Sequence, residues 1–296
     1  MILKKNLFRK IFFAILRLSL LPLVIRLLVQ RKKITIIAYH DINPQIADKH
    51  FNILKKRYNI ISLKNYFNAK RNAGTKILPQ KSLIITFDDG NCGNYKLIPI
   101  FKKYNIPATI FICSGIVGTN RHFWFKGKVD NETREFLMKA PDEERIEKLS
   151  SYGFEEEKEF ENRQALSDKE IEEMKGVVDF QAHTILHPIL TNCSLERTKR
   201  EIIHCKENLE DRYKLDIYAF SYPNGDYSSR EIEILKEAGY ECAITIEPGF
   251  NSLDTDVYKL KRIAIWDKAD INELLVRTSG LWSFLQKLFK LETNAH

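Results

Sequence analysis

Seven short apolar runs, rich in β-branched and aromatic residues, are distributed along this chain of 296 residues. Each has the length of a buried strand, and segments with helical periodicity separate them. Such an alternation is typical of a parallel sheet, because parallel strands need a crossover connection, usually a helix, between them. The runs are Ile34–Tyr39, Leu83–Phe87, Ala108–Cys113, Val177–Ala182, Tyr218–Tyr222, Cys242–Ile246 and Tyr258–Ile265.

The segments between these runs support the same fold class. Helical patterns cover Lys96–Tyr104, Ser194–Tyr213 and Ser228–Ala238, and Gly239 stands where the third of these helices is expected to end. We therefore predict an α/β fold, a barrel of about seven parallel strands. In such folds the catalytic side chains gather at the carboxyl ends of the strands.

Residues 130–163 interrupt this rhythm with a helical stretch that holds 12 acidic and 6 basic residues. The simplest interpretation is a solvated helical insertion that covers about residues 119–166. The alternative is a lid over the substrate, because the aromatic residues of 123–125 precede the acidic stretch and sugars stack on aromatic faces. We expect one catalytic domain, residues 34–296, that contains this insertion.

The positive charge of the chain is confined to its first residues. The whole sequence has 47 Lys and Arg against 39 Asp and Glu, a net charge of +8. Residues 1–33 hold nine of the basic residues and no acidic one, so the remainder carries 38 basic and 39 acidic residues, a net charge of −1. A neutral body lacks the extended basic surface that nucleic-acid binding requires, and we predict no nucleic-acid partner.

The basic residues of segment 1–33 are set within an apolar stretch, residues 7–29. Arg17, Pro22 and Arg26 interrupt this stretch so that no apolar run within it exceeds eight residues, whereas a spanning helix needs about 20. We predict a helix that lies on an anionic membrane surface with its arginines reaching lipid phosphates. An uncleaved signal anchor and an ordinary globular segment are the alternatives. The cytoplasmic face and the cell envelope are both compatible with this localisation.

Two adjacent carboxylates, Asp88 and Asp89, follow the run Leu83–Phe87 and precede Gly90. The two carboxylates cannot both point into an apolar core, because burying an unpaired carboxylate is costly. A metal ion or a set of hydrogen-bond donors would offset that cost. The motif alone is a weak signal, since turns use the same residue types.

Two histidines spaced four residues apart, His183 and His187, follow the run Val177–Ala182, and Pro188 comes directly after them. On one helical turn this spacing places both imidazoles on the same side, where they can hold one metal ion. Together with one carboxylate they make three protein ligands and leave positions open for water and substrate. The pattern therefore predicts a hydrolytic metal centre.

Together these motifs resemble those of the polysaccharide deacetylase family, the NodB-homology domain of carbohydrate esterase family 4. The family motif T-F-D-D is similar to Thr86–Asp89 here, and H-[ST]-x-x-H-P is similar to His183–Pro188. The resemblance extends over roughly residues 34–265. It implies a distorted (β/α) barrel and metal-dependent removal of N- or O-acetyl groups from sugars.

The same resemblance assigns roles to individual residues. It implies that Asp89, His183 and His187 bind the metal and that Asp88 is the general base. Zinc is the first choice for such a ligand set, and nickel, cobalt or iron would accept the same ligands.

A third family motif, R-x-P-Y-G, is matched less closely by Ser221–Gly225. By the resemblance, the backbone N–H of Asn224 stabilises the developing oxyanion. Tyr222 either lines the substrate pocket or is a packing aromatic at a strand end. Ser221 stands where the family often has an arginine that supports the base. Arg262, from the last predicted run, is the candidate replacement, and a surface ion pair is its alternative.

The general acid also departs from the common pattern. Family members often carry a histidine near the C-terminus, but here no histidine follows His204 except His296. Instead the first run ends in Tyr39 and His40, which look like the Y-H motif of the poly-N-acetylglucosamine deacetylases. We therefore predict that His40 donates a proton to the leaving amine, with a structural histidine bonded to backbone as the alternative.

These observations favour a metal-dependent hydrolase that removes acetyl groups, in the first place the N-acetyl group of an amino sugar, from a polysaccharide, an oligosaccharide or a glycolipid. An inactive carbohydrate-binding relative that keeps the groove is the alternative, because Ser221 replaces the motif arginine. Retention of Asp88 and of all three predicted ligands argues against that alternative.

Overall fold

Eight strands form one curled, parallel sheet in the part of the chain that the computed structural model describes, residues 2–72 and 78–289, with side chains from residue 7 onward. Seven of them are neighbours in the order β7-β6-β5-β4-β3-β1-β8, and the short strand β2 pairs with β3 outside this path. The strands are β1 (Ile34–Tyr39), β2 (Asn59–Ile60), β3 (Ser82–Phe87), β4 (Thr109–Ile112), β5 (Asp179–Ala182), β6 (Ala219–Ser221), β7 (Cys242–Ile244) and β8 (Ile263–Ala264).

The last strand of the sheet lies beside the first, because β8 pairs with β1. Leu260, just before β8, also contacts the opposite edge of the sheet. Its N–H donates to the Ala243 carbonyl at 3.1 Å, and its carbonyl accepts the Thr245 N–H at 2.9 Å. The sheet therefore curls until residues 260–264 connect its two edges, and the predicted α/β class with a curled parallel sheet is confirmed.

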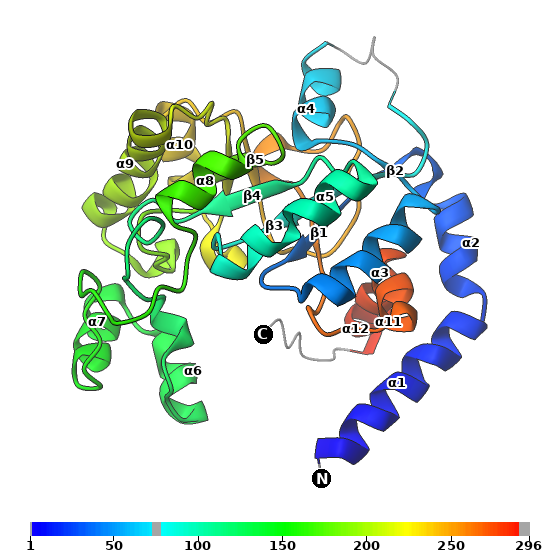
Figure 1. Ribbon diagram of the computed structural model, residues 1–296, viewed down its shortest axis with the longest axis horizontal. Coiled ribbons are helices and arrows are strands. Elements are labelled where there is room, and N and C mark those ends of the chain that lie inside the picture. Colours follow the sequence, from blue (N-terminus) through cyan, green and yellow to red (C-terminus); the bar gives the residue numbers. More distant parts are fainter. Residues whose placement is uncertain (1, 73–77, 290–296) are drawn as a thin grey trace.

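Helices surround this sheet. In Figure 1, α9 and α10 lie on one side of the molecule, whereas α1, α3, α11 and α12 lie on the other. The α-helices are α1 (Ile2–Leu18), α2 (Leu21–Leu28), α3 (Pro44–Lys55), α4 (Leu63–Arg71), α5 (Ile98–Tyr104), α6 (Asn131–Lys139), α7 (Asp142–Ser150), α8 (Asp168–Met174), α9 (Leu195–Tyr213), α10 (Ser229–Glu237), α11 (Ile271–Thr278) and α12 (Leu281–Phe289). Short 3-10 turns are η1 (Gln30–Lys32), η2 (Cys92–Leu97), η3 (Trp124–Lys126), η4 (Leu190–Asn192), η5 (Pro223–Gly225) and η6 (Val257–Lys259).

The side chains of β1 alternate between two apolar clusters. Ile37 and Tyr39 pack with residues of α3, α5, α9 and α10 in the larger cluster. Ile34 and Ile36 belong to a smaller cluster on the other face, to which α4 contributes. This burial on both faces explains why the strands form continuous apolar runs in the sequence.

Six of the seven predicted strands correspond to β1, β3, β4, β5, β6 and β7. The seventh, Tyr258–Ile265, is wrong in its first half, which contains the turn η6 and only later the short strand β8. The run is divided because Leu260 pairs with β7 whereas β8 pairs with β1. Strand β2 was not predicted, since two residues cannot show a periodicity.

The predicted helices agree with the structure in two cases. The segments Ser194–Tyr213 and Ser228–Ala238 correspond to α9 and α10. Gly239 follows α10 with φ of 73°, the left-handed conformation that ends a helix at low cost for glycine. The third segment, Lys96–Tyr104, begins within the turn η2 and continues as α5.

The acidic insertion forms two helices, α6 and α7, which project from the sheet (Figure 1). It has a small apolar core of its own, made by Trp124, Leu137, Leu149 and Ile189. Arg145 is buried beside this core, with its guanidinium carbon 4.8 Å from the centroid of the Trp124 ring, and it pairs with Asp142. The predicted helical insertion is present and most of its side chains are exposed, but a few are buried and pack together with Ile189.

The N-terminal helix α1 packs against the C-terminal helices α11 and α12. Phe13 is buried there, and its ring centroid lies 5.3 Å from that of Trp282. The buried side chain of Gln30 continues this attachment, since its amide donates to the Thr278 carbonyl at 2.8 Å. Segment 1–33 is thus joined to the other end of the chain by packed side chains.

The three arginines within residues 7–29 all bond to groups of the protein. Their partners are the Glu273 carboxylate for Arg9, Asn272 Oδ1 for Arg17 and the Arg57 carbonyl for Arg26. That these arginines reach lipid phosphates stays a prediction. Within the described residues, no individual helix combines the length and the apolarity that crossing a membrane requires; Leu7–Leu18 and Leu21–Leu28 meet both criteria only as a pair, which bends by 52°.

Candidate metal centre and active site

The predicted site residues follow the carboxyl ends of several strands. His40 comes after β1, Asp88 and Asp89 come after β3, and His183 comes after β5. β1 and β3 pair residue by residue up to their last positions. The parallel sheet therefore brings these distant positions of the sequence to one edge.

Asp89, His183 and His187 form a buried group whose ligand atoms all lie within 4.8 Å of one another. The Asp89 Oδ1 atom is 3.7 Å from His183 Nε2 and 3.5 Å from His187 Nε2. One carboxylate and two imidazoles thus converge, a donor set that suits zinc and other divalent first-row metals. The residues present fit a divalent metal ion.

The His183 ring is oriented by its second nitrogen. Nδ1 lies 2.7 Å from the carbonyl oxygen of Ser221, the last residue of β6. An Nδ1–H that donates to this carbonyl leaves Nε2 unprotonated and turned toward Asp89. Histidines that bind metals usually have such a partner on the other ring nitrogen.

His187 reaches the group through an irregular loop. Thr184 and His187 have left-handed backbone conformations, with φ of 68° and 59°, and Thr184 Oγ1 accepts the His187 N–H at 2.9 Å. Trp124 Nε1 donates to the His187 carbonyl at 2.7 Å. The prediction of a helical turn over these residues is therefore wrong. The expected convergence of the two rings is nevertheless present, since the centroids of His183 and His187 are 4.7 Å apart.

A buried carboxylate from α9 holds the same loop. Glu201 Oε2 accepts the N–H groups of Ile185 at 2.8 Å and Leu186 at 2.9 Å. Arg197, one turn earlier, lies 3.2 Å from Glu201 Oε1. Burial still raises the pKa of Glu201 above its ordinary value. Glu201 therefore positions the loop between the two histidines without touching either ring.

The turn after β3 separates the two carboxylates of the Asp-Asp-Gly motif. Asp89 and Gly90 both have left-handed backbone conformations, with φ of 72° and 71°. A Cβ atom at Gly90 would lie 2.6 Å from Ile112 Cγ2, so only glycine fits at this position. Asn91 Nδ2 donates to Asp89 Oδ2 at 3.3 Å. The sharp turn thus directs Asp88 and Asp89 toward different partners.

Arg262 forms a bidentate ion pair with Asp88. The distances from Nη1 to Oδ1 and from Nη2 to Oδ2 are both 2.7 Å, and Nη2 also donates to Ser221 Oγ at 3.1 Å. Burial alone would raise the pKa of Asp88, but the charge and hydrogen bonds of Arg262, together with His183 and His40, outweigh burial and hold that pKa well below its usual range. Arg262 is 1% exposed, so the alternative of a surface ion pair is wrong.

The ionisation of two candidate ligands, His187 and Asp89, suits metal binding. Burial, together with the neighbouring His183, lowers the pKa of His187 to about 3. Burial opposes ionisation of Asp89, but the charges of His187 and His40 lower its pKa below the ordinary value. A neutral imidazole and an ionised carboxylate are the forms that bind a divalent cation.

His40 lies beside the two carboxylates. Its backbone N–H donates to Asp267 Oδ1 at 3.2 Å, and its carbonyl accepts from Asn94 Nδ2 at 2.8 Å. The charge of its ring is among the causes that lower the pKa of Asp88 and of Asp89, after burial and the nearer partners of each. The structure therefore brings the predicted acid to the predicted base and ligand.

Two residues of the third motif, Tyr222 and Asn224, differ in their burial. Tyr222 is completely buried: its hydroxyl donates to the Tyr258 carbonyl at 3.1 Å, and its ring stacks on Tyr227 with centroids 4.9 Å apart. Tyr222 is therefore a packing aromatic, and the prediction that it lines the pocket is wrong. Asn224 is half-buried in the turn η5 with φ of 56°. The part of its backbone N–H in oxyanion binding stays a prediction.

A cavity of about 820 Å³ opens onto Asp89 and His40. The insertion contributes Phe125 and Lys126 to its wall. The ring centroid of Phe125 lies 4.6 Å from that of His187. The aromatic stretch before the insertion thus borders the candidate metal group, whereas the insertion helices α6 and α7 do not line this cavity.

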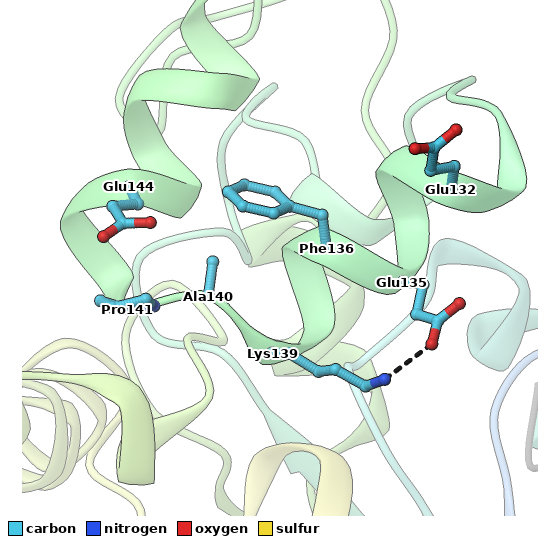
Figure 2. A pocket seen from close by; sticks show the side chains of 7 residues that line it. All are labelled: Glu132, Glu135, Phe136, Lys139, Ala140, Pro141 and Glu144. Atoms are coloured by element: carbon cyan, nitrogen blue, oxygen red, sulfur yellow. Dashed lines mark hydrogen bonds and ion pairs between the residues drawn. The ribbon is translucent and has the colours of Figure 1, made fainter.

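A second hollow, of about 460 Å³, lies on the insertion between α6 and α7 (Figure 2). Figure 2 shows Phe136 with Glu132 and Glu144 around it. Lys139 pairs there with Glu135 at 2.6 Å, and all five side chains are exposed. No predicted site residue lines this hollow, so we assign the chemistry to the larger cavity.

Sequence analysis missed several residues that support the site, namely Asn91, Glu201 and Asp267. Asp267 follows the last apolar run, as Asp88 follows an earlier one, so the same strand-end signal was present for it. Glu201 lies within the long helix α9 among several other acidic residues. Its sequence neighbours do not distinguish it from a solvated acid, because only the fold shows that it is buried.

Comparison with known families gives a match over the centre of the chain. A model of the family described as polysaccharide deacetylase matches residues 75–243, which is more than half of the chain. The match includes Asp88, Asp89 and both loop histidines but excludes His40 and Arg262.

Curated relatives carry more specific names. The poly-beta-1,6-N-acetyl-D-glucosamine N-deacetylase of Staphylococcus epidermidis is 24% identical over 220 residues, 71% of this chain and 62% of that protein. The protein of the same name from Staphylococcus aureus is 25% identical over 231 residues, 74% of this chain and 65% of that protein. The chain spans between 52% and 65% of the length of these and a further relative from Bacillus subtilis.

Solved structures share the fold. The deacetylase PplD of Streptococcus pyogenes, in complex with acetate, superposes with a TM-score of 0.61 at 23% identity and covers 83% of this chain and 98% of that one. IcaB of Ammonifex degensii gives a TM-score of 0.60 at 19% identity and covers 85% of this chain and 98% of that one. At these identities the likeness establishes the fold alone.

Proposed function

Because the chain belongs to the polysaccharide deacetylase family, we propose that it is a metal-dependent deacetylase that hydrolyses the N-acetyl group of an amino sugar in a glycan or glycolipid. The observation that carries this proposal is the buried group of Asp89, His183 and His187 with the Asp88–Arg262 ion pair beside it. The names of the staphylococcal relatives support N-acetylglucosamine as the sugar.

Asp89, His183 and His187 would hold the divalent ion, with zinc as the first choice and nickel, cobalt or iron as alternatives. Bound there, the ion would supply Lewis acidity toward the acetyl carbonyl and toward a water molecule. The role of the protein is to hold the three metal-binding side chains so that their donor atoms point toward one another. The Ser221 carbonyl orients His183, and Glu201 fixes the loop that carries His187.

Asp88 is the proposed general base, which takes a proton from the attacking water. The two hydrogen bonds from Arg262 orient the Asp88 carboxylate and keep it ionised. They also compensate a buried charge that would otherwise be strongly destabilising. Since Asp88 is adjacent to Asp89 in the chain, the base stays next to the metal group.

His40 is the proposed general acid. The water oxygen bonds to the acetyl carbon, the amide C–N bond breaks, and a proton from the His40 ring goes to the departing nitrogen. The products are acetate and the free amino sugar. The backbone N–H of Asn224 is proposed to stabilise the oxyanion that forms before the C–N bond breaks.

We further propose that segment 1–33 contacts an anionic membrane surface, on the cytoplasmic face or in the cell envelope. Helices α1 and α2 carry many exposed apolar side chains. The arginines of residues 7–29 are engaged within the protein, so the exposed cations Lys10, Arg31, Lys32 and Lys33 would supply the attraction to lipid phosphates.

The test of the proposed activity is acetate release from N-acetylglucosamine oligomers, with zinc, nickel, cobalt or iron supplied in turn. We expect turnover that a chelator stops and that one of these metals restores. Asp88→Asn should retain the metal, measured by elemental analysis, and lose about 10²–10⁴-fold in kcat. The control is Asp211→Asn, an exposed carboxylate on α9, which should leave both unchanged.

One result would contradict the proposed activity. If the chain bound metal but released no acetate from acetylated oligomers, polymers or glycolipids, the proposed hydrolysis would be wrong. A chain that then still bound these sugars would be a carbohydrate-binding relative.

A further inference from the structure

The cavity that opens onto Asp89 and His40 extends away from the sheet as far as the terminal helices. At its far end it is lined by Phe8 and Phe12 of α1 and by Trp282 of α12. Figure 1 shows α1 beside α11 and α12, and the packing of α1 onto α11 agrees with this view. One continuous cavity therefore joins the candidate catalytic group to helices from opposite ends of the sequence.

The cavity changes character along its length. Beside His40, it is lined by three acidic residues and one lysine, Asp41, Asp89, Asp267 and Lys126, and the Asp267 carboxylate accepts the backbone N–H groups of both His40 and Asp41. At the helical end, aromatic rings replace these acids. A ligand that fills the cavity thus needs a polar part at one end and an apolar part at the other.

The middle section of the cavity is cationic. Arg9 and Arg277 both line it, and both pair with the single buried carboxylate of Glu273, at 2.6 Å in the case of Arg277. Two guanidinium groups on one carboxylate leave a net positive charge. Arg9 also lies over Trp266, with its guanidinium carbon 3.6 Å from the ring centroid. This section therefore favours an anionic group between the two ends.

Helices α1, α2 and α12 together carry most of the exposed apolar surface of the described residues. Fifteen of nineteen large exposed apolar side chains lie on segment 7–29 or on α12. They include Leu18 at 77% exposed and Phe284 at 62% exposed. Exposed lysines and arginines at positions 10 and 31–33 border this surface. An apolar face with a basic border is complementary to an anionic bilayer.

We propose that the substrate is an acetylated amino sugar joined to a membrane lipid through an anionic linkage such as a phosphate. This proposal rests on the deacetylase function proposed above and specifies its substrate class. The sugar occupies the end beside His40 and Asp89, the linkage lies near Arg9 and Arg277, and the lipid chain leaves past Phe8 into the bilayer.

The reaction itself is unchanged by this assignment. Water supplies the oxygen of acetate and gives a proton to Asp88, the amide C–N bond breaks, His40 gives a proton to the departing nitrogen, and the linkage between sugar and lipid stays intact. A free glycan chain has neither a charge for the cationic section nor an apolar part for the helical end, so it would leave both unused.

The experiment compares three substrates with the full chain and its metal. The first is N-acetylglucosaminyl phosphate esterified to farnesol, in vesicles of phosphatidylcholine and phosphatidylglycerol. The others are N-acetylglucosamine 1-phosphate and an N-acetylglucosamine pentamer, both without lipid. We expect kcat/KM for the farnesyl substrate to exceed that for each soluble substrate by at least tenfold. Equal or higher kcat/KM for the pentamer overturns this inference and leaves the proposed function standing, whereas no acetate from any substrate overturns the proposed function.

Surface variants separate the docking face from the site. The double variant Leu18→Glu with Phe284→Glu changes two exposed residues that do not line the cavity. We expect it to lower kcat/KM tenfold for the farnesyl substrate in vesicles and to reduce flotation of the protein with those vesicles. Leu195→Glu, an exposed apolar residue at the start of α9, is the matched control and should change neither. An equal effect of both variants would contradict the assigned docking face.

Discussion

The strand-end wall of the cavity, formed by residues that follow β1, β3 and β5, and its helical wall, formed by α1, α11 and α12, are held together by different interactions. In the strand-end wall, charged and polar side chains are buried and paired, as in Asp88 with Arg262. In the helical wall, aromatic side chains such as Phe13 and Trp282 pack against one another, and many apolar side chains are exposed.

This difference determines how each wall responds to change. A buried ion pair that loses one partner leaves an unpaired charge, which costs about 3–5 kcal/mol. Apolar packing loses stability in proportion to the area and the cavity that a substitution creates. The strand-end wall therefore has a single working arrangement, whereas the helical wall can vary its surface while the fold is kept.

The largest expected effect belongs to the strand-end wall. His187→Ala removes one of three converging donors, so we expect loss of the bound metal and a fall in turnover of about 10⁴-fold or more. Metal content by elemental analysis and acetate release measure the two effects. His204→Ala, an exposed histidine on α9, is the control and should change neither. Full activity of the His187 variant would remove this histidine from the metal group.

The next effect tests the helical wall. Phe13→Ala removes a buried ring between α1 and the C-terminal helices, and we expect it to destabilise that contact by about 3–5 kcal/mol. Ile15→Ala, at 62% exposed on the same helix, should change stability by less than about 0.5 kcal/mol. Hydrogen exchange of the α1 amides measures this local stability. Equal protection in both variants would show that packing does not hold the helical wall.

A smaller effect is expected from Arg262→Lys. Lysine keeps the positive charge but cannot make the two parallel hydrogen bonds to Asp88, so the base loses its fixed orientation. We expect kcat to fall about 10–100-fold with KM and metal content unchanged. The control is Arg212→Lys, which changes a partly exposed pair with Asp168. A change in KM alone would indicate that Arg262 acts on substrate binding.

Sequence reasoning succeeded for the strand-end wall because its residues stand at the ends of apolar runs. His40, Asp88 and His183 each follow such a run directly, and a parallel sheet brings these positions together. The left-handed backbone at His187 was beyond sequence reasoning, because it depends on bonds to Trp124 and Glu201 that only the folded chain makes.

For the helical wall, the sequence could not predict which side chains the protein covers. The apolar side chains of residues 7–29 have the same pattern whether lipid or protein covers them, so the sequence could not distinguish docking from membrane contact. The structure divides the stretch: Phe13 is covered by the C-terminal helices, whereas Leu18 is exposed. The sequence also left two roles open for Arg262, support of the base or a surface ion pair. Its burial beside Asp88 depends on residues 260–264 joining both edges of the sheet, which only the fold shows.

The smallest effect is expected on the pH dependence of stability, at His50 of α3, where the two walls meet. Its Nδ1 lies 3.0 Å from the Tyr39 hydroxyl, next to His40, and its Nε2 lies 2.9 Å from the Ala269 carbonyl, just before α11. Burial lowers the pKa of His50 below its ordinary value of 6.5.

Since the unfolded chain binds this proton more readily than the folded protein, the contribution of His50 to stability is complete above about pH 6.5 and decreases as the pH falls below it. We expect the free energy of unfolding of the native protein to fall more between pH 7 and pH 5 than that of His50→Gln, which has no titrating ring at this position. Urea denaturation at the two pH values measures the difference. Parallel losses in both proteins would show that the contact between the walls does not depend on the neutral form of His50.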